Sequence, residues 1–296
     1  MTHPRPFEQF VAPARARPQL WRLIAGLVVV VAVYALWMAL MGLGLWLTTA
    51  SGTFDMRLAE VGTGSDPVSL IVLLLTFAGM ALGVFAAVRW LHGRPAGSVF
   101  GRAPVVLRDF LAGLVVLGGL GLVGLLTMPL AHDLQPGLDL RLWLMFLPLA
   151  LVGLLIQTGA EELVFRGYMQ QQLAARFRSA LVWMVLPSIL FGLVHYAPSE
   201  MGDNSWFVVL ATGAFGLAAA DLTARSGSLG LAWGLHFANN VFAVLFFTAG
   251  DVLDGMALYR LPFGPDDLDD MRPLIVADIA VIAFAWFLCR LWLRSR

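Results

Sequence analysis

Three short groups of polar residues interrupt the long apolar stretches of this 296-residue chain. An ionised side chain in the middle of a bilayer costs roughly 2.5–3.5 kcal/mol, so those that persist there usually face a protein interior and serve a function. A carboxylate base, an imidazole that carries a proton and hydrogen-bond donors for an oxyanion are the groups needed to hydrolyse an acyl bond. The candidate residues are Glu161, Glu162, Arg166, Phe191, His195, His236 and Asn240.

The first group contains two adjacent glutamates and an arginine. On an α-helix, Glu162 and Arg166 are four residues apart and lie on one face, with the acid in the favoured N-terminal position. Glu161 is turned about 100° away from Glu162, because 3.6 residues complete a turn. The spacing therefore predicts that Arg166 neutralises Glu162 while Glu161 points into a cavity. A structural ion pair without any chemical role is the alternative interpretation.

The other two groups repeat the spacing of four residues. His236 and Asn240 project from one helix face, and so do Phe191 and His195. Taken singly, either imidazole could be a hydrogen-bonding residue between packed helices, and Phe191 could be an aromatic residue that only forms part of a packed wall. The occurrence of all three groups on three different apolar segments favours a shared site.

The segments that must position these residues are long and apolar. The chain is 59% hydrophobic and only 13% charged, about half the charge of a soluble domain. A hydrocarbon core of ~30 Å requires about 20 apolar residues in a helix. The sequence therefore excludes a soluble globular domain and predicts an all-α membrane protein, a polytopic bundle of about eight transmembrane helices. The predicted spans, of which the fourth and fifth are short, are 23–47, 68–88, 110–130, 142–157, 181–196, 206–222, 229–247 and 274–293.

The connections between these spans alternate in charge. The connection 89–108 holds four arginines, whereas the connection 251–270 holds six aspartates. Under the positive-inside rule the arginine-rich side is cytoplasmic, which predicts a multi-pass protein of the cell (inner) membrane with both termini cytoplasmic. The predicted parts are a cytoplasmic N-terminal arm (1–22), transmembrane helices 1–3 (23–140), a core with the three polar groups (141–250), an acidic extracytoplasmic loop (251–272) and a last transmembrane helix with a cytoplasmic tail (273–296).

The three groups resemble the motifs of the CAAX-prenyl-endopeptidase and bacteriocin-processing (CPBP, or Abi) intramembrane proteases. The family pattern is E-E-x-x-x-R, then F-x-x-x-H, then H-x-x-x-N or D, and this chain matches all three. The stretch EELVFRGY at residues 161–168 is also typical of the family. The resemblance covers roughly residues 142–250 and implies that the core 141–250 is catalytic.

The resemblance also implies a role for each motif residue. Glu161 with His195 would activate a water molecule, and His236 with Asn240 would hold the oxyanion. The residues that would shape the site are Glu162, Arg166 and Phe191.

The function implied is an intramembrane endopeptidase that hydrolyses a peptide bond in a membrane-associated protein or peptide. The expected partners are this membrane-anchored substrate and the lipid bilayer, with no nucleic acid. A catalytically silent scaffold or a bacteriocin self-immunity factor of the same fold is the alternative. A proton-coupled transporter is disfavoured, because the polar residues cluster instead of forming a chain across the membrane. The H-E-x-x-H helix of zinc proteases, the G-x-S-G motif of rhomboid type and the Y-D plus G-x-G-D pair of presenilin type are all absent from the sequence.

Two histidines and a glutamate also form a possible zinc-ligand set. The histidines lie on separate segments, however, and the spacing pairs His236 with Asn240, which is a poor zinc ligand. The sequence therefore favours a site without metal or other cofactor. In the zinc alternative, the ligands are Glu161, His195 and His236.

The expected depths of these residues in the membrane do not match. A rise of 1.5 Å per residue places His236 about 10 Å and His195 about 20 Å from the cytoplasmic side, with Glu161 close to the boundary. The three side chains converge only if the fifth segment is not a full span or the chain bends, for which Pro187 is a candidate.

Overall fold

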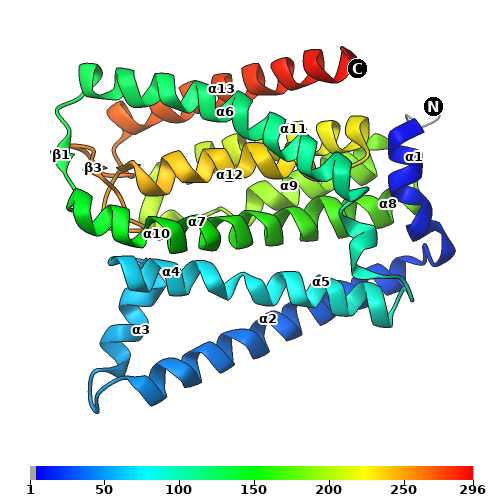
Figure 1. The fold of residues 1–296 in the computed structure, drawn as a ribbon, viewed down its shortest axis with the longest axis horizontal. Helices are drawn as coiled ribbons and strands as arrows, with labels where there is room; N and C mark the ends of the chain where they lie inside the picture. The colour runs from blue at the N-terminus through cyan, green and yellow to red at the C-terminus, as the bar shows by residue number, and fades with distance from the viewer. Residues whose placement is uncertain (1–4, 296) are drawn as a thin grey trace.

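The computed structural model describes residues 5–295, and the described chain folds as a bundle of helices (Figure 1). Residues 1–4 of the expected N-terminal arm and Arg296 of the expected tail lie outside the described residues. The predicted all-α fold is confirmed. The elements in chain order are α1 (Arg5–Val11), η1 (Ala12–Ala16), α2 (Leu20–Thr48), α3 (Phe54–Thr63), α4 (Pro67–Thr76), α5 (Ala78–Trp90), η2 (Ala96–Val99), α6 (Ala103–Ala131), β1 (Gln135–Pro136), α7 (Leu140–Glu162), η3 (Leu163–Gln170), α8 (Gln171–Arg176), η4 (Leu181–Val185), α9 (Leu186–Leu193), α10 (Pro198–Met201), η5 (Gly202–Asn204), α11 (Ser205–Ser226), α12 (Gly230–Leu245), β2 (Phe247–Thr248), β3 (Tyr259–Arg260) and α13 (Leu268–Arg294).

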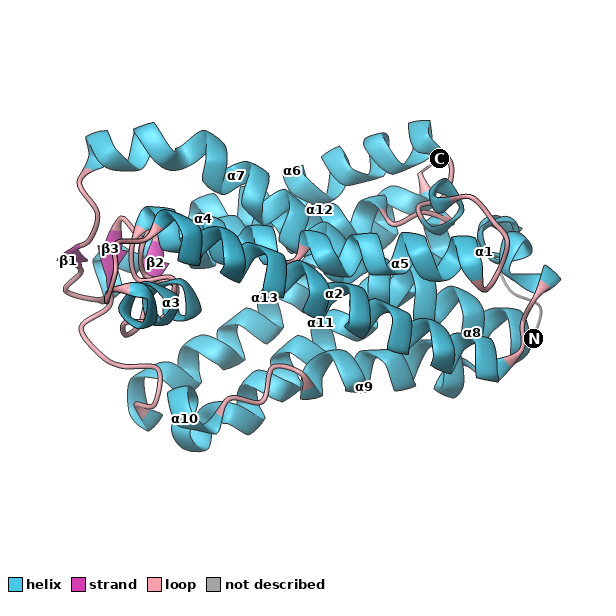
Figure 2. Cartoon of the chain, turned by 90° about the horizontal axis from the view of Figure 1, so that it is seen from below, coloured by secondary structure: helices cyan, strands magenta, loops and turns pink. Residues whose placement is uncertain are grey.

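The two ends of the bundle differ in what they carry. Both termini of the described chain lie at one end, which we call the terminal end, and the three short strands lie at the other, the strand end (Figure 2). In the small sheet the central strand β3 pairs antiparallel with β1 and parallel with β2. At the strand end, aspartates begin three of the helices and accept hydrogen bonds from their first backbone N–H groups, as N-caps do. These capping residues are Asp66 of α4, Asp139 of α7 and Asp267 of α13.

Six helical segments within residues 5–295 are long and apolar enough to cross a membrane. They correspond to six of the eight predicted spans and confirm a multi-pass membrane protein. The two remaining predicted spans are also helical but shorter, because Leu181–Leu193 has few turns and α12 has only 16 residues. At 1.5 Å per residue α12 is about 24 Å long. These two short segments are the ones that position the histidines of the second and third motifs.

The fourth helix extends well beyond the predicted span. The predicted span ends near Gln157, and the spacing of Glu162 and Arg166 predicts helix beyond it. Helix continues from Leu140 to Arg176, a segment of 37 residues, so Glu161 lies well inside it. The part that follows Glu162, η3, is a π-helix, a wider turn that is often found at functional sites.

This longer helix explains how the first two motifs come to the same depth. The chain turns back between Arg176 and Leu181, so η3 and α8 run antiparallel to η4 and α9. Glu161 lies fifteen residues before Arg176, and His195 lies fourteen residues after Leu181. Residues at equal distances from the turn of a hairpin lie at the same level. The contact between the rings of Phe165 and Phe191, whose centres are 5.0 Å apart, supports this register.

The third motif is fixed by close packing of α12 against α6. Cβ atoms added at Gly230 and Gly234 would lie only 2.3 Å and 2.2 Å from backbone oxygens of α6, and one at Gly113 of α6 would lie 2.7 Å from a backbone oxygen of α12. Small residues are what allow helices to approach this closely. The α12 helix is thus held by backbone contacts that leave no room for adjustment.

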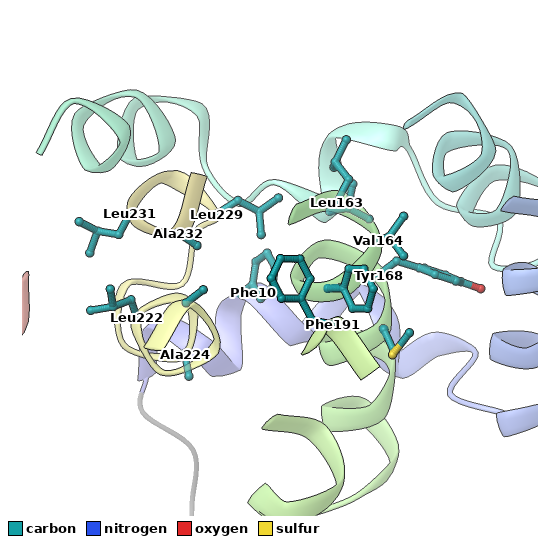
Figure 3. Packing of buried hydrophobic residues seen from close by; sticks show 14 of the residues in the cluster. Phe10, Leu163, Val164, Tyr168, Phe191, Leu222, Ala224, Leu229, Leu231 and Ala232 are labelled. Atoms are coloured by element: carbon teal, nitrogen blue, oxygen red, sulfur yellow. The ribbon is translucent and has the colours of Figure 1, made fainter. Parts of the chain in front are cut away.

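The N-terminal arm folds onto the terminal end of the bundle. Phe7, Phe10 and Val11 of α1 are buried in the main apolar core, and the side-chain amide of Gln171 donates to the backbone oxygen of Phe10 at 2.7 Å. Figure 3 shows Phe10 in the same cluster as Phe191 and residues of η3, α11 and α12. The arm therefore covers the helices that carry the first two motifs.

Candidate active site

Four motif side chains from three helical segments line one cavity of about 400 Å³. Glu161 projects from α7, His195 follows the last turn of α9, and His236 and Asn240 come from α12. Phe191 forms part of the same wall. The structure thus brings together the residues that the sequence assigned to one site.

Glu162 and Arg166 lie behind this cavity, with their side chains only 0% and 2% exposed. Nη1 of Arg166 donates to Oε1 of Glu162 at 3.0 Å, so the ion pair predicted from the spacing is present. The guanidinium carbon of Arg166 lies 4.4 Å from the centre of the Phe191 ring, within range for a cation–π interaction. Arg166 of this pair therefore packs against the Phe191 ring behind the cavity wall.

His236 lies between the two glutamates. Its Nδ1 is 2.9 Å from Oε1 of Glu162, and its Nε2 is 3.5 Å from Oε2 of Glu161. Because an ionised carboxylate can only accept, Nδ1 of His236 donates to Glu162. The spacing had paired His236 with Asn240, and the resemblance had paired Glu161 with His195. In the structure, the imidazole that contacts Glu161 belongs to His236, because spacing along one helix cannot identify a partner on another.

His195 is oriented by its own helix. Its Nδ1 lies 2.7 Å from the backbone oxygen of Phe191. Since a carbonyl oxygen only accepts, Nδ1 carries the proton, and Nε2 of the neutral ring keeps a free lone pair. The ring is half-buried, and its centre is 4.9 Å from that of Phe191. His195 can therefore accept a hydrogen bond from a molecule in the cavity.

The sequence analysis missed Gln157, which links two of the motif residues. Its Nε2 donates to Oε1 of Glu161 at 2.9 Å, and its Oε1 accepts from Nδ2 of Asn240 at 2.8 Å. Gln157 lies four residues before Glu161, on the same helix face. That spacing was the available signal, but the residue was interpreted as the end of a span.

The sequence analysis also missed Asp278, which lines the cavity from α13. The signal was a single carboxylate within the apolar run of the last predicted span. The remaining wall is mostly apolar and comes from α4, α11 and the loop that contains Leu253.

The three residues of the zinc alternative, Glu161, His195 and His236, line the same cavity. Within residues 5–295, no three His, Cys, Asp or Glu side chains are grouped so that they could hold a metal ion. His236 contacts a carboxylate with each of its ring nitrogens, and Nδ1 of His195 bonds to the Phe191 carbonyl. The Nδ1 atoms of both imidazoles are therefore engaged in hydrogen bonds.

The fold and the site together define a polytopic membrane protein in which several helices enclose a polar, carboxylate-containing cavity. Residues 142–242 match the family model of the type II CAAX prenyl endopeptidases, Rce1-like. This segment holds all three motifs, so the resemblance drawn from them is confirmed. The chain is also similar to the uncharacterized protein YyaK of Bacillus subtilis (strain 168), with 28% identity over 249 residues, which cover 81% of this chain and 82% of YyaK.

Proposed function

We propose that the protein is an intramembrane endopeptidase that hydrolyses a peptide bond in a membrane-associated protein or peptide. The observation that carries this proposal is the convergence of Glu161, His195, His236 and Asn240 on one cavity within the segment that matches the family. Buried carboxylates and imidazoles in a membrane protein are costly and usually functional.

Glu161 acts as the general base in this proposal. One of its oxygens, Oε1, is held by Gln157, and the other, Oε2, accepts no hydrogen bond from the described residues. Glu161 and Nε2 of His195 are both acceptors, so one water molecule can donate a hydrogen bond to each of them. The water oxygen then attacks the carbonyl carbon while Glu161 takes the proton.

His236 and Asn240 stabilise the oxyanion that forms. The amide of Asn240 has two N–H groups, of which one bonds to Gln157, so the second remains to donate into the cavity. Nε2 of His236 lies at the same wall, and in the oxyanion role the ring donates from Nδ1 to Glu162 and from Nε2 to the oxyanion. When the C–N bond breaks, Glu161 returns its proton to the leaving amine.

This mechanism uses no metal, because a carboxylate base and two hydrogen-bond donors supply both the nucleophile and the oxyanion site. Stoichiometric zinc in active protein, lost together with activity on chelation and restored by zinc, would contradict it.

We further propose that the terminal end of the bundle faces the cytoplasm and that the protein lies in the cell (inner) membrane. The distribution of arginines between the spans supports this orientation. Reporter fusions after Arg102, Glu200, Arg225 and Asp267 should read inside, outside, inside and outside in turn. A C-terminal fusion that reads outside would overturn the orientation.

The proposed function is tested by comparative membrane proteomics of three strains, which carry the wild-type gene, a deletion or Glu161→Gln. We expect the same uncleaved membrane protein to accumulate in the deletion and the Glu161→Gln strains. A Glu161→Gln strain that behaves as wild type would support the silent scaffold or immunity factor, because a scaffold does not need the base.

A further inference from the structure

Asp278 is a carboxylate in the middle of a membrane-crossing helix. The α13 helix is one of the six long apolar segments, and Asp278 lies ten residues after its first residue, Leu268. Its side chain lines the same cavity as Glu161. Acidic residues at such positions are rare and usually have an identifiable partner. Within residues 5–295, Asp278 has no hydrogen-bond or ion-pair partner.

The contacts of α13 with α11 fix the depth of Asp278. The two helices run in the same direction, since Arg272 near the start of α13 donates to Asn204, just before α11, at 3.0 Å. Further along, Nε1 of Trp286 donates to Asp221 near the end of α11 at 2.9 Å. Asp278 is six residues after the first contact and eight before the second. Parallel helices have equal rise, so it lies level with residues 210–213 of α11.

This level is also that of the second motif. Ala211 and Thr212 line the cavity, and a Cβ at Gly192 would lie 3.2 Å from the Cα of Gly213. The last turn of α9, which holds Phe191 and directly precedes His195, therefore packs beside the part of α11 that is level with Asp278. Asp278 thus faces the cavity at the depth of the candidate catalytic residues and from a helix that carries none of them.

The charges around the cavity leave Asp278 unneutralised. Glu162 is paired with Arg166 outside the cavity, and His236 lies between Glu161 and Glu162. No arginine lines the cavity, and the chain contains no lysine. A carboxylate in a low-dielectric wall attracts a cation strongly. A cationic group on an entering molecule would supply this counter-charge.

We propose that Asp278 is a specificity-determining residue that binds a positively charged side chain, arginine or lysine, of the substrate close to the scissile bond. This proposal rests on the proposed endopeptidase function. The preferred substrate class is a membrane-anchored peptide with a basic residue next to the apolar segment.

The test uses single-span hydrophobic peptides that differ at one position beside the span. The peptides of one set carry Arg, Gln or Glu at this position. In each further set, the substituted position is shifted along the peptide by one residue. Binding is measured to full-length protein in lipid nanodiscs in the Glu161→Gln background, which binds without cleaving. For at least one position, the Arg peptide should bind roughly 10- to 100-fold more tightly than its Gln counterpart, as expected for a buried charge pair. The Glu peptide should bind most weakly.

Asp278→Asn should abolish the preference for Arg while leaving the affinity for the Gln peptide unchanged, and Asp278→Glu should keep the preference. Asp270→Asn is the matched control, because Asp270 is an exposed carboxylate in the first turn of the same helix. Equal binding of Arg and Gln peptides at every position, or a preference that survives Asp278→Asn, would overturn the proposal. The peptide comparison does not depend on any Asp278 variant folding.

A cleavage assay with Glu161 intact separates this proposal from the proposed function. If the Arg peptides bind in an Asp278-dependent manner but are not hydrolysed, the assignment of Asp278 holds and the endopeptidase function fails. If the peptides are hydrolysed at equal rates whichever residue they carry, the function holds and the assignment of Asp278 fails.

Discussion

The helix that carries the first motif and the first long helix of the chain have opposite surroundings. Residues 157–174 are buried without interruption, although they include two glutamates, an arginine and several glutamines. The 29-residue α2 helix has only three buried residues, Leu23, Gly26 and Val30. A helix buried on every side tolerates polar residues only where each one has a partner, whereas a lipid-facing helix needs only apolar side chains. The difference shows which helix forms the centre of the molecule and which the periphery.

Ion pairs in the two regions should differ most in their effect on stability. Glu162→Gln leaves Arg166 buried without its counter-charge, which should lower the free energy of unfolding by about 3–5 kcal/mol. The peripheral pair of Arg57 and Glu60 in α3, also a hydrogen-bonded ion pair at 2.8 Å, is partly exposed. Arg57→Gln should change stability by about 0.5 kcal/mol or less. Thermal unfolding in detergent would measure both, and equal shifts would contradict the contrast.

Neighbouring amides on α12 should differ in their effect on turnover. Asn240→Ala removes an oxyanion donor and the bond to Gln157, so kcat should fall roughly 10²- to 10³-fold. Asn239→Ala is the matched control, because Asn239 also lines the cavity but donates only to Asn240, at 3.3 Å. We expect less than a roughly tenfold change for this variant. If Asn239→Ala were the more damaging change in a peptidase assay, the oxyanion assignment would be wrong.

Glycines in the packed centre and at the lipid-facing periphery give the smallest contrast in stability. Gly234→Ala would place a Cβ 2.2 Å from the backbone oxygen of Phe110, and such overpacking costs about 1–3 kcal/mol. A Cβ at Gly42 of α2 would meet nothing within 4 Å, so Gly42→Ala should be neutral or stabilise the helix by up to about 1 kcal/mol. Thermal unfolding of the two variants checks this, and a loss of stability in Gly42→Ala would show that α2 has a packed partner there.

The sequence predicts the helical fold and the motif residues well, because both depend on local patterns. Apolar runs of about 20 residues identify spans, and a spacing of four residues identifies which side chains share a helix face. The ion pair of Glu162 and Arg166 is of this kind, and it is present.

The errors arise where contacts between helices decide the outcome. The fourth span was predicted to end near Gln157, where the apolar run stops, although helix was expected through the first motif. His236 contacts both glutamates, Arg166 pairs with Glu162, and the helix therefore continues through this position. The partner of His236 and the roles of Gln157 and Asp278 likewise depend on which helices are neighbours, and a single helix pattern does not contain that information.

The central claim is that Glu161 is the base and Glu162 a structural counter-ion. The most direct measurement compares Glu161→Gln and Glu162→Gln for peptidase turnover and thermal stability in parallel. An amide has the shape of the carboxylate but cannot take a proton from water, so Glu161→Gln should accumulate and unfold like wild type while turnover falls roughly 10²- to 10⁴-fold. Glu162→Gln should instead lose stability and yield. A well-folded, inactive Glu162→Gln together with an active Glu161→Gln would contradict the assignment.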